Sequence, residues 1–207
     1  MSARLTFPLA ILLAACSGGE RPAAGCADAP ACTGAAPWRA VATPEDRDRL
    51  SRWRDAWTTA LPAARGTDAA GIAALGPLAE PDLALTEPVP PAGTYRCRVV
   101  KLGAVAADRP GFRSLPAATC RIDADGSLTT LDGGQRAIGR IYASTDTRGV
   151  FLGALALGDE QAGPAYGADA QRDMAGFVER VAERRWRVVL PYPAFESVLD
   201  VMELVPA

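Results

Sequence analysis

Residues 93–100, with the sequence GTYRCRVV, decide the fold class of this chain. Tyr95, Cys97 and Val99 alternate with two arginines, so that apolar and charged side chains point to opposite faces of an extended backbone. This period of two predicts a strand with one buried face. It also marks the point along the chain where helical patterning changes to strand patterning.

Further segments with strand patterning follow at 119–123, 127–131, 136–142, 149–157, 174–181, 185–190 and 198–205. Turns rich in glycine and aspartate separate several of them. About eight antiparallel strands of this length close into an up-and-down barrel, which leaves no exposed sheet edge. The sequence therefore predicts an α+β, mainly β fold, with an N-terminal helical hairpin packed on an approximately eight-stranded antiparallel barrel of lipocalin-like or inhibitor-like type. An open twisted sheet or a sandwich is the alternative.

Helical patterning precedes the strands. Thr43 fits a helix N-cap, with Pro44 at the first helical position. Apolar residues then recur at helical spacing at positions 50, 53, 57 and 61 and form one stripe. A second helix over residues 67–75 completes a hairpin, and a proline-rich stretch follows it. We expect Trp53 and Trp57 to pack against the neighbouring barrel and not to form a ligand cage. Presentation of this stripe to a partner protein is a further alternative.

Residues 13–16, LAAC, end a short apolar run and precede the small residues SGG. They resemble the lipobox of bacterial lipoproteins, in which a signal peptidase cuts before a cysteine that carries the lipid. The apolar run of about eleven residues is too short for a bilayer-spanning helix. We expect lipid attachment at Cys16, and Ser17 favours sorting to the periplasmic face of the outer membrane. A soluble periplasmic or secreted protein is the alternative.

These features divide the chain into a signal peptide (1–15), a lipid-anchored flexible tether (16–37), a helical hairpin with a proline-rich connection (38–90) and an antiparallel β domain (91–207). We expect residues 38–207 to form one folded unit.

The chain has 5 cysteines, so lipid attachment at Cys16 leaves an even number. Cys26, Cys32, Cys97 and Cys120 allow three pairings. Disulfide bonds are expected in a compartment outside the cytoplasm, and pairing of cysteines near in sequence, 26 with 32 and 97 with 120, is the simplest arrangement. A 97–120 bond closes a loop of about 24 residues and stabilises the fold by roughly 3 kcal/mol.

The composition excludes several classes of function. With 0 histidines, the chain has no Ser-His-Asp or Cys-His catalytic group and no imidazole for zinc. The net charge of −2 provides no excess of positive charge that would attract nucleic acid. We assign no catalytic, cofactor or metal-binding residues and expect no nucleic-acid partner.

Two sets of residues are candidate surface binding sites. Glu196 and Asp200 are a possible acid/base pair. Arg136 and Arg140, beside a glycine-rich turn, have the chemistry to bind a carboxylate or phosphate. The charged residues of 179–187 are expected to form cross-strand pairs on a solvated barrel exterior, with an anion- or peptide-binding surface as the alternative.

Blocks at 46–50, 53–57, 93–98, 151–153, 158–160, 166–169, 185–187, 190–193, 196–197 and 203–206 resemble an uncharacterised bacterial envelope family of sphingomonads and relatives, the domain of unknown function DUF4893. The resemblance covers nearly the whole chain from Trp38 onward. It implies a joint unit of helices and sheet and no assigned activity.

The sequence therefore predicts a bacterial envelope lipoprotein that acts as a non-enzymatic binding or assembly module, held at the membrane by its lipid and contacting an envelope protein. A carboxylate-dependent envelope hydrolase using Glu196, Asp200 or Glu179 is one alternative, and a carrier of a small apolar ligand is another. The carrier requires an open barrel. A filled barrel is favoured by the bulky residues expected to point inward, namely Tyr95, Val99, Ile122, Trp186, Val188 and Leu190.

Overall fold

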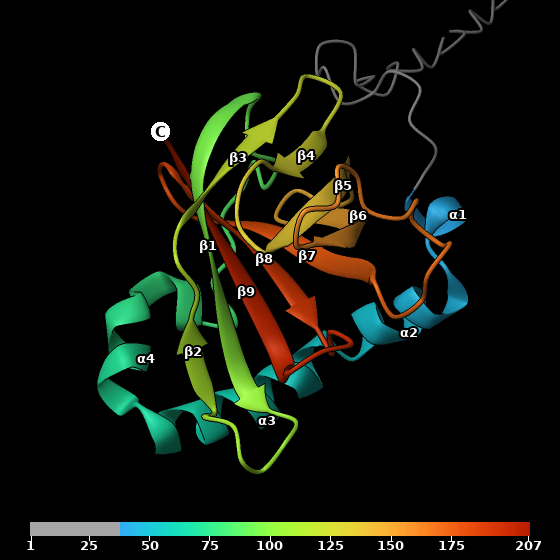
Figure 1. The fold of residues 1–207 in the computed structure, drawn as a ribbon. Coiled ribbons are helices and arrows are strands. Elements are labelled where there is room, and N and C mark those ends of the chain that lie inside the picture. Colours follow the sequence, from blue (N-terminus) through green and yellow to red (C-terminus); the bar gives the residue numbers. More distant parts are fainter. Residues whose placement is uncertain (1–37) are drawn as a thin grey trace, which may run out of the picture.

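The computed structural model describes residues 38–207 (Figure 1). The helices are α1 (Trp38–Val41), α2 (Pro44–Ser51), α3 (Trp53–Thr67) and α4 (Ala69–Leu75), followed by the 3-10 helix η1 (Gly76–Ala79). The strands are β1 (Gly93–Ala104), β2 (Phe112–Ser114), β3 (Ala118–Ile122), β4 (Ser127–Thr130), β5 (Gln135–Ala143), β6 (Gly149–Leu157), β7 (Asp173–Ala182), β8 (Arg185–Pro191) and β9 (Ser197–Pro206). The predicted signal peptide, the tether and Cys16, Cys26 and Cys32 lie outside the described residues.

The strands form a closed antiparallel barrel of 8 strands with one extra strand. The barrel closes because β1 pairs with β3 on one side and with β9 on the other. The short β2 adds to the second half of β1. The structure therefore confirms the predicted barrel and not the open sheet or sandwich. The ends of each predicted strand agree with the observed ends to within one or two residues, except that β1 extends beyond the predicted segment 93–100.

The side chains that alternate toward the inside of the barrel fill its interior, as predicted. Five of the six residues expected to point inward belong to one buried apolar cluster, and the sixth, Val99, is partly buried and packs against it. Within it, Tyr95 and Trp186 meet edge to face with ring centroids 6.2 Å apart. A disulfide bond joins Cys97 to Cys120 on the neighbouring strands β1 and β3, with Cα atoms 5.9 Å apart. This predicted pairing is confirmed.

Helix α2 begins where the sequence indicates, but the helical region divides differently and includes the unpredicted α1. The hydroxyl of Thr43 accepts the N–H of Asp46 at 3.1 Å and caps α2, with Pro44 at its start. The predicted single stripe spans two helices, because Arg52, with φ −95° and ψ 14°, separates α2 from α3. The second helix of the hairpin starts at Ala69, capped by the carboxylate of Asp68.

A second apolar core lies between the helices and the outside of the barrel. Trp57, 1% exposed, and Leu61 of α3 pack with Val100, Val189 and Val201, which point outward from β1, β8 and β9. Figure 1 shows α3 running across this part of the barrel. The stripe is therefore buried, which removes the main support for its presentation to a partner protein.

The first helices cover a different part of the wall. Residues of α1 and α2 form a third apolar cluster with outward-facing side chains of β6 and β7. Among the helices within residues 38–207, none is long and apolar enough to cross a membrane.

Candidate functional site at the barrel mouth

One end of the barrel holds a small cavity of about 50 Å³. Its wall is mainly apolar and includes Val99, Leu155, Met174, Leu190 and Met202. The loop between β8 and β9 forms part of its rim through Pro193, Ala194 and Phe195. Deeper inside, the bulky side chains of the interior cluster occupy the barrel, so this end is its open mouth.

Lys101, the only lysine of the chain, lies at the floor of the mouth. Its side chain is 7% exposed, and its Nζ lies 2.9 Å from Oδ2 of Asp200 and 3.4 Å from Oε2 of Glu196. Lys101 and Asp200 are directly opposite each other in the β1–β9 register. The register thus supplies the buried ammonium with the counter-charge that it needs.

The two carboxyl groups around Lys101 are shifted in opposite directions. Burial raises the pKa of Asp200, whose other oxygen accepts a hydrogen bond from the Ser197 hydroxyl. Burial also acts to raise the pKa of Glu196, but the positive charges of Lys101 and Arg113 outweigh it and the net shift is downward. Nη2 of Arg113 lies 2.6 Å from Oε2 of Glu196. Lys101 and Asp200, which line the cavity, therefore form a charge-balanced cluster with Glu196 and Arg113 beside it.

Backbone geometry holds the rim in place. Glu196 has a φ of 70° and Tyr192 a φ of 47°, so both lie in the left-handed region that non-glycine residues seldom adopt. The N–H of Val105, just beyond β1, donates to the Glu196 carbonyl at 3.2 Å. These two residues flank the rim residues 193–195 and fix the turn that carries them.

A further carboxyl group lines the cavity at the start of β7. Asp173 is 5% exposed, and its Oδ1 accepts the N–H of Gly167 at 2.9 Å. Burial raises the pKa of Asp173. The wall of the mouth thus offers polar atoms at defined points among apolar side chains, which suits recognition of a small group.

The structure brings Glu196 and Asp200 together, as the acid/base hypothesis requires, but through a residue that the sequence analysis did not single out. Lys101 has the same parity as Tyr95, Cys97 and Val99. Continuing the alternation by one step would have placed the only lysine inside the barrel, which is the signal that identifies this site.

Arg136 and Arg140 lie four residues apart on β5 and engage different parts of the chain. The Arg136 guanidinium donates to the carbonyl oxygens of Gly133, Gly158 and Glu160. Arg140 pairs with Asp125 at 2.5 Å. Both guanidiniums thus contact turns between strands. The structure does not bring these two arginines to the mouth.

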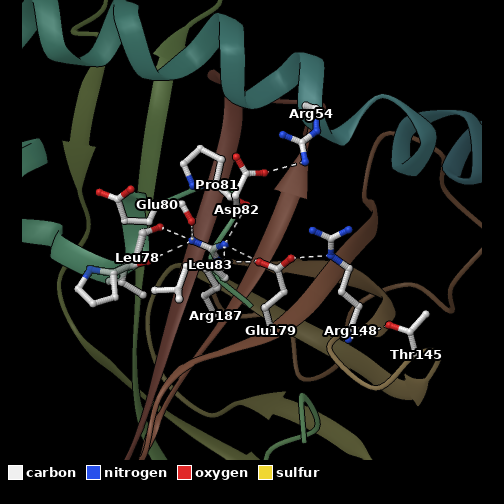
Figure 2. A network of polar contacts seen from close by, with 11 residues as sticks. Arg54, Leu78, Glu80, Pro81, Asp82, Leu83, Thr145, Arg148, Glu179 and Arg187 are labelled. Carbon is white, nitrogen blue, oxygen red and sulfur yellow. Dashed lines mark hydrogen bonds and ion pairs between the residues drawn. The ribbon is translucent and has the colours of Figure 1, made fainter. Parts of the chain in front are cut away.

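The expected solvated exterior at 179–187 is wrong for two residues. The side chains of Glu179 and Arg187 are both 0% exposed, and Nη2 of Arg187 lies 2.6 Å from Oε2 of Glu179 (Figure 2). The other Glu179 oxygen lies 2.7 Å from Nε of Arg148. The segment from η1 toward β1 covers this pair, and that long-range contact has no local signature in the sequence.

The Arg187 side chain binds the backbone of the covering segment, residues 77–83. Its guanidinium donates to the carbonyl oxygens of Pro77, Leu78, Glu80, Pro81 and Leu83. Figure 2 shows these carbonyl groups gathered around the end of the arginine. Every donor is directed at the chain itself, so this network joins the helical segment to the barrel, and Glu179 is removed from the hydrolase candidates at the mouth.

Among residues 38–207, no group of three or more cysteine, aspartate or glutamate side chains is placed to hold a metal ion. Neither the comparison with curated proteins nor the comparison with solved structures gave a match. The family described as "Domain of unknown function (DUF4893)" matches residues 38–204, which run from the start of α1 into β9. The chain therefore belongs to the DUF4893 family.

Proposed function

We propose that this chain is a bacterial envelope lipoprotein whose barrel mouth binds a partner protein without catalysing a reaction. In this proposal, lipid on Cys16 holds the protein at the periplasmic face of the outer membrane. The supporting sequence features are LAAC at residues 13–16 and the serine that follows. The partner inserts one apolar side chain into the mouth.

The size of the mouth cavity carries this proposal. A buried water needs about 10–15 Å³ of comparable space, so a cavity of about 50 Å³ accommodates a few heavy atoms. Pockets for whole small-molecule ligands are larger, typically about 300–1,000 Å³. An aliphatic side chain fits the available space, whereas a carried apolar ligand does not.

The rim supports a protein partner as well. Phe195 is 39% exposed beside the cavity, and aromatic side chains are frequent anchors of protein interfaces. Polar groups of Gln135 and Gln171 also line the mouth. A short peptide segment would therefore meet an apolar socket with hydrogen-bonding groups around it.

Photo-crosslinking in intact cell envelopes tests the proposal. A photo-reactive amino acid replaces Phe195 at the rim, and the same group replaces Leu131, which is 49% exposed between β4 and β5, as the matched control. We expect a discrete protein adduct from position 195 and none from position 131. We also expect Cys16→Ala to abolish the adduct, because the protein no longer reaches its partner.

Two outcomes would contradict the proposal. Equal adduct patterns from both positions would show non-specific contact, and the absence of any adduct from position 195 would show that the mouth is unoccupied. An adduct that is unchanged in the Cys16→Ala variant would refute the anchoring part alone.

A carboxylate hydrolase is the second candidate, favoured by the opposed pKa shifts of Glu196 and Asp200 around Lys101. We rank it lower because both carboxyl groups are engaged by Lys101, and Arg113 and Ser197 bind them as well. Hydrolysis of cell-wall sugars or peptides by the full chain, lost in Glu196→Gln, would reverse the ranking.

A further inference from the structure

We propose that a groove on the outer face of the barrel, separate from the mouth, binds a phosphate group. Its volume is about 410 Å³, and its lining comprises Arg96, Arg98, Ala117, Arg185, Glu203 and Val205. These residues come from β1, β8, β9 and the connection before β3. Arg96 and Arg98 lie nearer the start of β1, whereas Lys101 at the mouth lies nearer its end. The groove and the mouth therefore lie toward opposite ends of this strand.

The groove carries an excess of positive charge. Three guanidinium groups face a single carboxylate, that of Glu203. The whole chain has a net charge of −2, so this excess is a local feature and does not follow from a basic composition. It favours an anionic ligand.

Glu203 positions two of the arginines. Its side chain is 10% exposed, and its Oε2 accepts from Nε and Nη2 of Arg98 at 3.1 and 2.8 Å. Its Oε1 accepts from Nε of Arg185 at 2.6 Å. The shared carboxylate therefore fixes both side chains before a ligand arrives, which lowers the entropy cost of binding.

These contacts leave donors for a ligand. Glu203 engages the Nε and Nη2 atoms, so the Nη1 groups of Arg98 and Arg185 are not used by it. Arg96 is exposed, lies two residues before Arg98 on the same face of β1, and has no ion-pair partner among the described residues. Guanidinium groups match the oxygens of phosphate in geometry and charge.

Phosphate could reach this groove in a soluble phosphate ester or in a lipid headgroup, and the recognition chemistry is the same in both. The site is independent of the proposed function, since it shares no residue with the mouth.

The test is titration of the full chain with inorganic phosphate at low ionic strength, followed by calorimetry. We expect saturable binding, weakened about tenfold by Arg96→Gln, since one charge-assisted contact of this kind corresponds to roughly a factor of ten. Arg65→Gln, an exposed arginine of α3 away from the groove, is the charge-matched control and should bind as the wild type does. Because Arg96 pairs with no carboxylate within residues 38–207, both variants should keep the wild-type unfolding midpoint.

The absence of saturable binding would overturn the proposal, and so would equal weakening by Arg96→Gln and Arg65→Gln. A sedimentation arm with phosphatidylglycerol and phosphatidylcholine vesicles identifies the source. If Arg96→Gln associates more weakly than wild type with phosphatidylglycerol vesicles, and the two proteins associate equally with phosphatidylcholine vesicles, the ligand is a lipid headgroup. Equal association of both proteins, together with the phosphate result, indicates a soluble ester. Residues 1–37 are identical in both proteins, so any difference in vesicle association between them comes from the groove.

Discussion

Lys101 shows how a single position joins the fold to the candidate site. Strand alternation directs its side chain into the barrel, where an isolated ammonium would be strongly disfavoured. Asp200 and Glu196 provide the compensating charges within 2.9 and 3.4 Å. A charged pair at this depth leaves the mouth polar at its floor and apolar along its wall.

Replacing Lys101 tests this pairing. Lys101→Met should lower the free energy of unfolding by about 3–5 kcal/mol, because it leaves the Asp200 carboxylate buried without its partner. The double variant Lys101→Met/Asp200→Leu should recover much of that loss, since it removes both charges. Urea unfolding measures each value. A loss below about 1 kcal/mol in the single variant would show that the pair is already well solvated.

Asp173 gives a pH-dependent prediction. Its pKa is raised from the ordinary 3.8, chiefly by burial and further by the nearby Asp46 and Asp169 carboxylates, against the opposing Arg49 charge and the Gly167 N–H. A carboxyl group with a raised folded-state pKa stabilises the fold below its unfolded pKa, and this contribution is lost as the pH rises through the folded value. Asp173→Asn keeps an oxygen for the Gly167 N–H and should gain stability relative to wild type between about pH 3 and pH 7. A relative stability that stays constant over this range would contradict the assignment.

At the scale of elements, the strands were predictable and the covering segment was not. The alternation of apolar and polar residues along β1 and the following strands showed which side chains point into the barrel, because burial of one face requires an apolar residue at every second position. The three-residue β2, Phe112–Ser114, is too short for periodicity to reveal. The Glu179 and Arg187 side chains look like ordinary surface residues in the sequence, and they are buried because residues 77–83 and the Trp57 ring of α3 cover them.

The carbonyl cluster around Arg187 predicts a strict requirement for guanidinium. Arg187→Lys should cost at least about 2 kcal/mol of stability, because an ammonium group cannot reach all of the carbonyl oxygens and leaves buried acceptors unpaired. The same change in the surface pair, Arg140→Lys, should cost less than about 0.5 kcal/mol. Denaturant unfolding compares the two, and equal costs would argue against the anchoring role.

The Cys97–Cys120 bond links β1 to β3 and reports on the closure of the barrel. Replacing both cysteines with alanine should reduce stability by roughly 3 kcal/mol in the chain-entropy model, while the barrel remains folded by its hydrogen bonds and interior packing. Thermal unfolding of the oxidised wild type and the double variant gives the difference. Unchanged stability would show that the bond adds no constraint beyond that packing.

At the scale of the whole molecule, the helices and the outer wall of the barrel share an apolar core that is separate from the apolar interior of the barrel. The stripe of α3 covers outward-facing residues of β1, β8 and β9, and the cavity opens from the interior between the β8–β9 loop and the start of β7. The sequence predicted this architecture because periodicity and turns are local. The charged cluster at the mouth depends on which residues meet across the barrel, so the sequence indicated only two of its members, Asp200 in the cavity and Glu196 beside it.

If the mouth accommodates a side chain of a partner protein, filling the mouth with a bulky side chain should prevent binding. Ala194→Trp places an indole at the rim of the cavity, whereas Ala143→Trp places one at the far end of β5 from Gln135, which lines the mouth. Both alanines are exposed, so both variants should fold. The measurement is the yield of the partner identified by crosslinking, recovered from envelopes with each variant. We expect loss of the partner with Ala194→Trp and wild-type recovery with Ala143→Trp, and equal recovery with the two variants would contradict the proposed binding at the mouth.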